Sequence, residues 1–97
     1  MSIEAIVKGL SVIVADNTPN LSARQICIVG LCYLEGAATV RGLAKRLNVA
    51  KPTISQAVNR LVSLGFVRKV VDVADRRSVF VYALPPGQEF LESLVVA

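Results

Sequence analysis

The chain has 97 residues, of which 54% are hydrophobic and 19% charged, and its mean hydropathy is +0.58. This length supports one hydrophobic core, and the apolar content excludes an intrinsically disordered chain, so we expect a single domain over residues 1–97. The longest uncharged stretch, residues 78–88, is too short for a membrane-spanning helix, which needs about 20 apolar residues. Glu4 and Lys8 interrupt the N-terminal apolar segment, so no secretory signal is expected and the predicted location is the cytoplasm.

The net charge of +4 is distributed unevenly along the chain. Residues 1–40 carry a net charge of −1, residues 41–77 carry +7 and residues 78–97 carry −2. A basic block between weakly acidic, apolar flanks indicates a surface that binds a polyanion. The alternative is a solvated face with scattered basic side chains.

The absence of histidine excludes Ser–His and Cys–His nucleophile pairs and histidine metal ligands, so we expect neither an enzyme nor a cofactor. Cys27 and Cys32 match no zinc-binding spacing and would lie roughly 140° apart around a helix, so they could not join locally. We expect both to be buried structural thiols. The alternative is redox sensing by Cys27, because Arg24 lies one turn before it and would favour a thiolate.

Two helices are predicted before residue 37. The first spans residues 2–14, begins at the capping residue Ser2 and is followed by a turn over residues 16–20. The second begins at Ser22, which forms a capping box with Gln25, and ends at Gly36. It is apolar nearly all round, so we expect it to be the central, most buried helix.

Two further helices are separated by a short turn. Thr39 opens the third, which ends at Leu47, and residues 48–50 form the turn. The fourth spans residues 51–64, has Pro52 in its first turn and stops at Gly65. Its apolar stripe comprises Ile54, Ala57, Val58, Leu61 and Leu64, and the opposite face carries Gln56, Asn59, Arg60 and Ser63.

After Gly65 the pattern changes to that of strands, which we expect over residues 66–71 and 78–84, joined by a charged loop at 72–77. A last helix is predicted over residues 86–96. The predicted fold is therefore mainly α with a small β-hairpin (α+β), a winged helix-turn-helix. Its fourth helix fits the major groove of DNA, where Gln56 and Asn59 can pair with adenine and Arg60 with guanine, while Lys51 suits phosphates.

The chain resembles the winged-helix core of the MarR family of transcriptional regulators over about residues 20–90. The stretches that carry the resemblance are residues 21–25, 40–47, 49–55 and 60–67, the wing sequence Asp75-Arg76-Arg77-Ser78, and Leu84 with Gly87. The chain departs from the family pattern at Ala50, where a capping serine is common, at Pro85, where threonine is usual, and in its short terminal helices.

The resemblance implies a sequence-specific regulator of transcription, a repressor, that binds double-stranded DNA. It implies that Arg77 enters the minor groove while Asp75 holds its guanidinium, and that Lys69 stands where an arginine contacts the backbone. The expected DNA-binding residues are Lys51, Thr53, Ser55, Gln56, Asn59, Arg60, Lys69, Asp75, Arg76 and Arg77.

Apolar terminal helices over residues 1–15 and 86–97 favour a homodimer, formed through Ile3, Ile6, Val7, Leu10, Phe90, Leu91 and Leu94. Because these helices are short, we expect no bulky pocket and no small-molecule effector. The alternative function is a winged-helix module that binds other proteins in a larger assembly.

Overall fold

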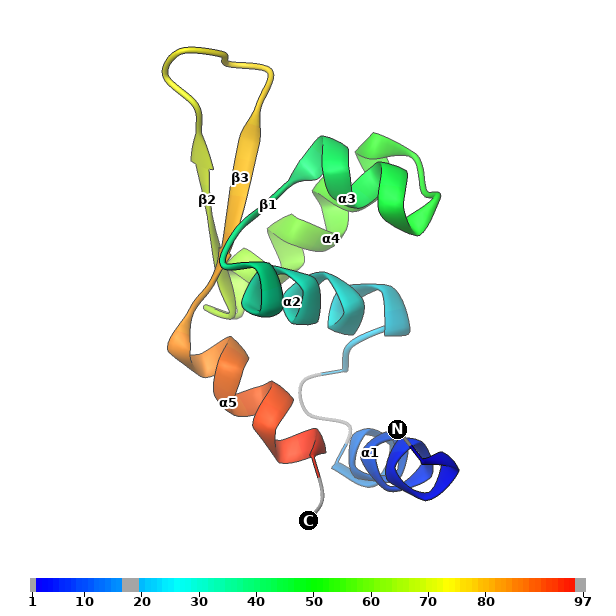
Figure 1. Ribbon diagram of the computed structural model, residues 1–97. Helices are drawn as coiled ribbons and strands as arrows, with labels where there is room; N and C mark the ends of the chain where they lie inside the picture. Colours follow the sequence, from blue (N-terminus) through cyan, green and yellow to red (C-terminus); the bar gives the residue numbers. More distant parts are fainter. Residues whose placement is uncertain (1, 17–19, 96–97) are drawn as a thin grey trace.

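The computed structural model describes residues 2–16 and 20–95, and Figure 1 shows their arrangement. The helices are α1 (Ile3–Asp16), α2 (Ala23–Glu35), α3 (Val40–Leu47), α4 (Lys51–Ser63) and α5 (Pro85–Leu94), and the strands are β1 (Ala38–Thr39), β2 (Val67–Val71) and β3 (Val79–Ala83). Within the described ranges every helix is too short or too polar to cross a membrane. The centre of the predicted turn after α1, residues 17–19, and Val96 of the predicted last helix lie outside the described residues.

α1 and α2 are capped at the residues that the sequence predicts, but α1 continues to Asp16, beyond its predicted end at residue 14, and α5 ends at Leu94, before Val95 of the predicted helix. The Ser2 hydroxyl accepts a hydrogen bond from the Ala5 N–H at 3.0 Å, at the start of α1. At the start of α2 the Ser22 hydroxyl accepts from the Gln25 N–H at 3.2 Å, and the Gln25 side chain accepts from the Ser22 N–H at 2.8 Å. The predicted capping box is therefore confirmed.

Gly65 ends α4 in the predicted manner. Its φ of 74° lies in the left-handed region that favours glycine. The Gly65 N–H donates to the Val62 carbonyl and the Phe66 N–H to the Leu61 carbonyl, both at 3.0 Å. These two bonds form a Schellman motif, which turns the chain back so that β2 runs against α4.

The predicted hairpin is present, and one additional strand joins it. β2 pairs antiparallel with β3 from Val67 opposite Ala83 to Val71 opposite Val79. β1 pairs with the other edge of β3, with Ala38 opposite Val81, so the sheet order is β1-β3-β2. The sequence analysis missed β1. Its pairing ties the segment between α2 and α3 to the hairpin.

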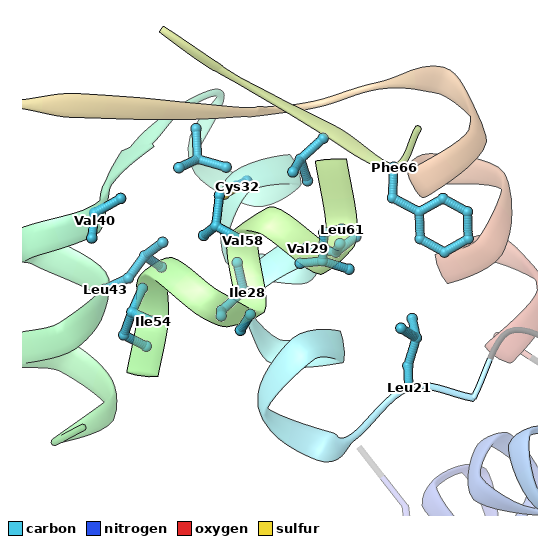
Figure 2. Close-up of a cluster of buried hydrophobic side chains, with 13 residues drawn as sticks. Leu21, Ile28, Val29, Cys32, Val40, Leu43, Ile54, Val58, Leu61 and Phe66 are labelled. Carbon is cyan, nitrogen blue, oxygen red and sulfur yellow. The ribbon is translucent and has the colours of Figure 1, made fainter. Parts of the chain in front are cut away.

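The core lies where α2, α3 and α4 meet the sheet, and Figure 2 shows most of its side chains pointing toward one another. Phe66 and Phe90 extend it toward α5, with ring centroids 5.2 Å apart. The buried apolar residues are Leu21, Ile28, Val29, Cys32, Val40, Leu43, Ile54, Ala57, Val58, Leu61, Phe66, Val67 and Val81. Burial of this cluster away from water fixes the angles between the helices and the sheet.

α2 is buried on one face only and has three buried residues where α4 has four, so the expectation that it is the most buried helix is wrong. Ile28, Val29 and Cys32 are fully buried, but Leu34 is 77% exposed and Cys27 is also exposed. The expectation of two buried thiols is therefore wrong for Cys27. It is correct for Cys32, where burial raises the thiol pKa to about 11.

α1 lies away from the core, beside α5 and at the opposite end of the molecule from the tip of the hairpin (Figure 1). Gly9 is its one buried residue among those described, and it faces the Leu94 carbonyl of α5. α5 packs against the core through Phe90 and Leu91, and α1 joins the molecule through α5.

Candidate nucleic-acid interface

Backbone hydrogen bonds close the turn between α3 and α4. Asn48 has a φ of 55° and caps α3, and its N–H contacts the carbonyls of Ala44 and Lys45. The Val49 N–H also donates to the Ala44 carbonyl, at 3.0 Å. Three residues, Asn48 to Ala50, thus separate the helices, which is the turn length of a helix-turn-helix.

α4 presents the polar face that the sequence predicts. Its buried side comprises Ile54, Ala57, Val58 and Leu61, which pack into the core. On the opposite side Lys51, Gln56, Asn59 and Arg60 are exposed, and Thr53 and Ser55 are half-buried near the start of the helix. These six side chains include both donors and acceptors of hydrogen bonds, as reading base edges requires.

The first turn of α4 has no side-chain cap, because Ala50 stands at the N-cap position. The Ala50 carbonyl accepts from the N–H groups of Thr53 and Ile54, at 3.0 and 3.2 Å. Pro52 contributes no N–H to this end of the helix. The Lys51 ammonium and the positive end of the helix dipole therefore lie together where a phosphate would approach.

Asn59 and Lys69 contact each other across the junction of α4 and the hairpin. The Lys69 Nζ donates to the Asn59 Oδ1 at 2.6 Å, and both residues are exposed. The sequence analysis assigns each of them to DNA independently. The structure brings them together as one pair.

Two aspartates brace the loop between β2 and β3 from within. The Asp72 side chain accepts from the Ala74 N–H at 2.9 Å, and the Asp75 side chain accepts from the Arg77 N–H at 3.1 Å. Asp75 also accepts from the Ser78 hydroxyl at 3.3 Å and from the Arg77 Nε at 3.4 Å. The Arg77 backbone N–H is the main cause that lowers the pKa of the Asp75 carboxyl, aided by the side chains of Arg77 and Ser78.

The wing arginines extend into solvent at the tip of this loop. Arg76 is exposed, and the Arg77 side chain is 81% exposed even though Asp75 contacts its Nε. The contact between Asp75 and Arg77 that the resemblance implies is thus present. An ion pair this exposed adds little stability, so its effect is to orient the guanidinium.

Of the nine basic residues between positions 41 and 77, several have partners within the chain. Arg46 of α3 forms an ion pair with Glu35 at the end of α2. The Arg68 guanidinium stacks over the Tyr82 ring at 5.5 Å, and Lys69 binds Asn59. Lys51 and Arg60 are exposed on α4, and Arg76 and Arg77 are exposed at the tip of the wing, so both elements present basic side chains to solvent.

A polar hollow beside α4 was not anticipated from the sequence. It has a volume of about 160 Å³ and is lined by the N-cap Ser22 and by Arg24 and Gln25 of α2, together with Thr53 and Gln56 of α4. The capping box at the start of α2 was the available signal, because it keeps polar groups at that helix end. The sequence alone does not show that α2 begins beside α4.

The residues predicted for dimerisation divide into two groups. Ile3, Ile6, Val7 and Leu10 project from α1 and are between 47% and 82% exposed. Phe90 and Leu91 of α5 instead pack against the core of their own chain, and Leu94 is half-buried. Among the predicted dimerisation residues, the exposed apolar side chains therefore belong to α1.

An apolar groove of about 590 Å³ lies between α1, the start of α2 and the end of α5. Its lining includes Ile6, Leu10, Ile26, Cys27 and Leu94. This volume lies in the range of small-molecule pockets, so the expectation that short terminal helices leave no sizeable pocket is wrong. The groove arises because α1 contacts the rest of the chain mainly through α5.

Comparisons with known proteins agree on one family. The sequence profile of the MarR family matches residues 18–78. The uncharacterised HTH-type transcriptional regulator YwaE of Bacillus subtilis is 32% identical over 78 residues, which are 80% of this chain and 46% of that protein. The chain therefore spans about half the length of this curated relative.

Solved structures share the fold over nearly the whole chain. The transcriptional regulator Tm0710 of Thermotoga maritima has a TM-score of 0.81 and 30% identity, over 94% of this chain and 62% of its own. BldR of Sulfolobus solfataricus has a TM-score of 0.74 and 28% identity, over 94% and 63%. A MarR mutant from E. coli, solved in complex with operator DNA, has a TM-score of 0.75 and 21% identity, over the same shares. This chain belongs to the MarR family of winged-helix transcriptional regulators.

Proposed function

We propose that this protein is a homodimeric repressor that binds a specific double-stranded DNA site, with α4 in the major groove and the wing in the adjacent minor groove. The observation that carries this proposal is that α4 and the tip of the wing both expose basic side chains, on two elements that the Asn59–Lys69 contact joins. The E. coli MarR mutant of similar fold was solved on operator DNA, which supports the same mode of binding here.

In the major groove, the exposed residues of α4 supply the base contacts. Gln56 and Arg60 are one turn apart on the solvent side of the helix, so both reach the same groove. Lys51 and the uncapped start of α4 bind the phosphates that flank it. These phosphate contacts position the helix, and the base contacts select the sequence.

In the minor groove, Arg77 provides the contact. The Asp75 carboxylate accepts hydrogen bonds from the backbone N–H and the Nε of Arg77, and these bonds orient the Arg77 guanidinium at the tip of the loop. Narrow A·T-rich minor grooves have a strongly negative potential that attracts an inserted arginine. We therefore expect an A·T-rich segment beside each major-groove contact.

The dimer forms through α1. Its exposed side carries Ile3, Ile6, Val7 and Leu10, an apolar face that a second copy would remove from water. Two-fold symmetry then places two copies of α4 about one DNA turn apart and requires a palindromic site. A dimer bound over a promoter competes with other proteins for that DNA, which is the physical basis of repression.

Selection of bound sequences from random duplex DNA, followed by a salt titration, tests this proposal. We expect a palindrome with A·T-rich segments and an affinity that falls with salt at a log–log slope near −0.9 per neutralised phosphate. Arg77→Ala should weaken binding and reduce the A·T preference. Lys8→Ala removes the same charge from α1, outside the DNA-binding surface, and should leave both unchanged in a variant that sedimentation shows to have the same oligomeric state as the wild type.

The outcome that would overturn the proposal is the absence of any selected sequence together with weak, salt-independent binding. The exposed apolar face of α1 would then favour the second candidate, a winged-helix module that binds another protein. Sedimentation tests the dimer separately: Leu10→Asp should give a monomer, and a wild-type monomer at tens of micromolar would refute this part of the proposal.

A further inference from the structure

The Asn59–Lys69 pair joins two parts of the DNA-binding surface that are ten residues apart in the chain. Asn59 lies in α4 and Lys69 in the middle of β2, and the Lys69 Nζ donates to the Asn59 Oδ1 at 2.6 Å. One partner is charged, so this bond is shorter and stronger than one between two neutral groups. The two side chains therefore behave as a single unit.

The register of the sheet places Lys69 on the side that faces the helices. Side chains alternate along a strand, so Lys69 shares its face with Val67, which is 1% exposed. Its cross-strand partner Val81 is fully buried. Lys69 thus occupies a core-facing position near the edge of the sheet, where its stem covers apolar surface and its ammonium reaches Asn59.

The ammonium determines which way the Asn59 amide points. A lysine ammonium only donates hydrogen bonds, so it requires the amide oxygen to face it. The Nδ2 group, with two N–H donors, then faces the other way. Gln56 precedes Asn59 by three residues on the exposed side of α4, so these donors lie on the strip that carries the base-reading residues.

Resting on the proposed function, we propose that Lys69 is a positioning residue that makes Asn59 read guanine instead of adenine. The bidentate asparagine–adenine pair needs the amide oxygen to accept from adenine N6, and here Lys69 already engages that oxygen. The Lys69 ammonium and the Asn59 Nδ2 group therefore offer only hydrogen-bond donors to a base edge. Guanine is the purine whose major-groove edge carries acceptors only, N7 and O6.

Lys69→Met tests this assignment, because it retains the stem of the side chain and removes the ammonium. The amide is then free to rotate, and we expect the preference at one base pair of each half-site to shift from guanine toward adenine by about tenfold. Lys69→Arg still donates to Asn59 and should restore guanine. In an Asn59→Ala background, Lys69→Met should produce no shift at that base pair.

Arg68→Met is the matched control, since it removes the same charge from the adjacent residue on the opposite face of β2, where Arg68 stacks over Tyr82. It should not change the selected base. If Lys69 only contacted phosphate, Lys69→Met would lower affinity for all sequences equally and reduce the salt slope by about 0.9 with the base preference unchanged, which would overturn this inference alone. A wild-type protein that selects no sequence would overturn the proposed function as well.

Discussion

Gly87 holds α5 against the turn that follows α4, and its replacement by alanine tests how closely the two are packed. A Cβ at position 87 would lie 2.3 Å from the Phe66 carbonyl oxygen and 3.1 Å from its carbon. The same oxygen accepts the Leu84 N–H at 2.8 Å. A methyl group at this position therefore has to displace backbone, because no flexible side chain can move aside.

Three effects determine the size of the change. Overpacking costs about 1–3 kcal/mol, and loss of the bond between Leu84 and Phe66 costs about 1 kcal/mol. The higher helix propensity of alanine stabilises the fold by about 1 kcal/mol relative to glycine and offsets part of this loss. The net expectation for Gly87→Ala is a loss of about 2 kcal/mol, which lowers the Tm by about 8–16 °C in a domain of this size.

Thermal unfolding followed by circular dichroism, at one fixed protein concentration, measures the effect. Gly30→Ala is the matched control, because a Cβ at position 30 in α2 meets no atom within 4 Å. It should stabilise the protein by about 1 kcal/mol through helix propensity alone. If Gly87→Ala raised the Tm as Gly30→Ala does, the close packing of α5 on the Phe66 turn would be refuted.

Three further predictions concern the start of α4, the thiols and the wing. Ala50→Ser adds the missing N-cap and should raise the stability by about 1 kcal/mol in the same unfolding assay, whereas an unchanged Tm would mean that the first turn of α4 needs no cap. Iodoacetamide at pH 8 should alkylate the exposed Cys27 and not Cys32, whose thiol is buried with a pKa of about 11; equal rates, measured by mass spectrometry, would contradict this. NMR titration should place the Asp75 pKa below the ordinary value of an aspartate, so its stabilising effect on the loop is present above the unfolded-state pKa and is lost as the pH falls through the lowered value. The backbone N–H at position 77 is the main cause, so Arg77→Ala should leave the pKa lowered, and a return to the ordinary value would contradict the assignment.

Features set by neighbouring residues could be predicted from the sequence. The capping box of Ser22 and Gln25 and the glycine stop at Gly65 depend on contacts within six residues, so composition and spacing identify them. The polar face of α4 follows from helical periodicity in the same way. These local signals also carry the resemblance to the MarR family, which the comparisons confirm.

Features that depend on distant segments could not be predicted. β1 is two residues long and forms only because Ala38 meets Val81, more than forty positions later. Periodicity marks Asn59 and Lys69 as exposed, but the bond between them depends on the strand register and on the turn at Gly65. The apolar sequence of α2 also misleads, because exposed Cys27 and Leu34 lie on the side away from the core.

The loop at the end of the wing has a consequence for how such a protein diversifies. Its bracing is internal: Asp72 and Asp75 bind groups within the loop, and the Asp72 N–H closes it on the Ser78 carbonyl at 2.9 Å. Insertions or exchanges between these closing residues leave the hydrophobic cluster untouched. The loop at the tip can therefore be exchanged between relatives to change the groove preference of the wing while the packing of the core stays the same.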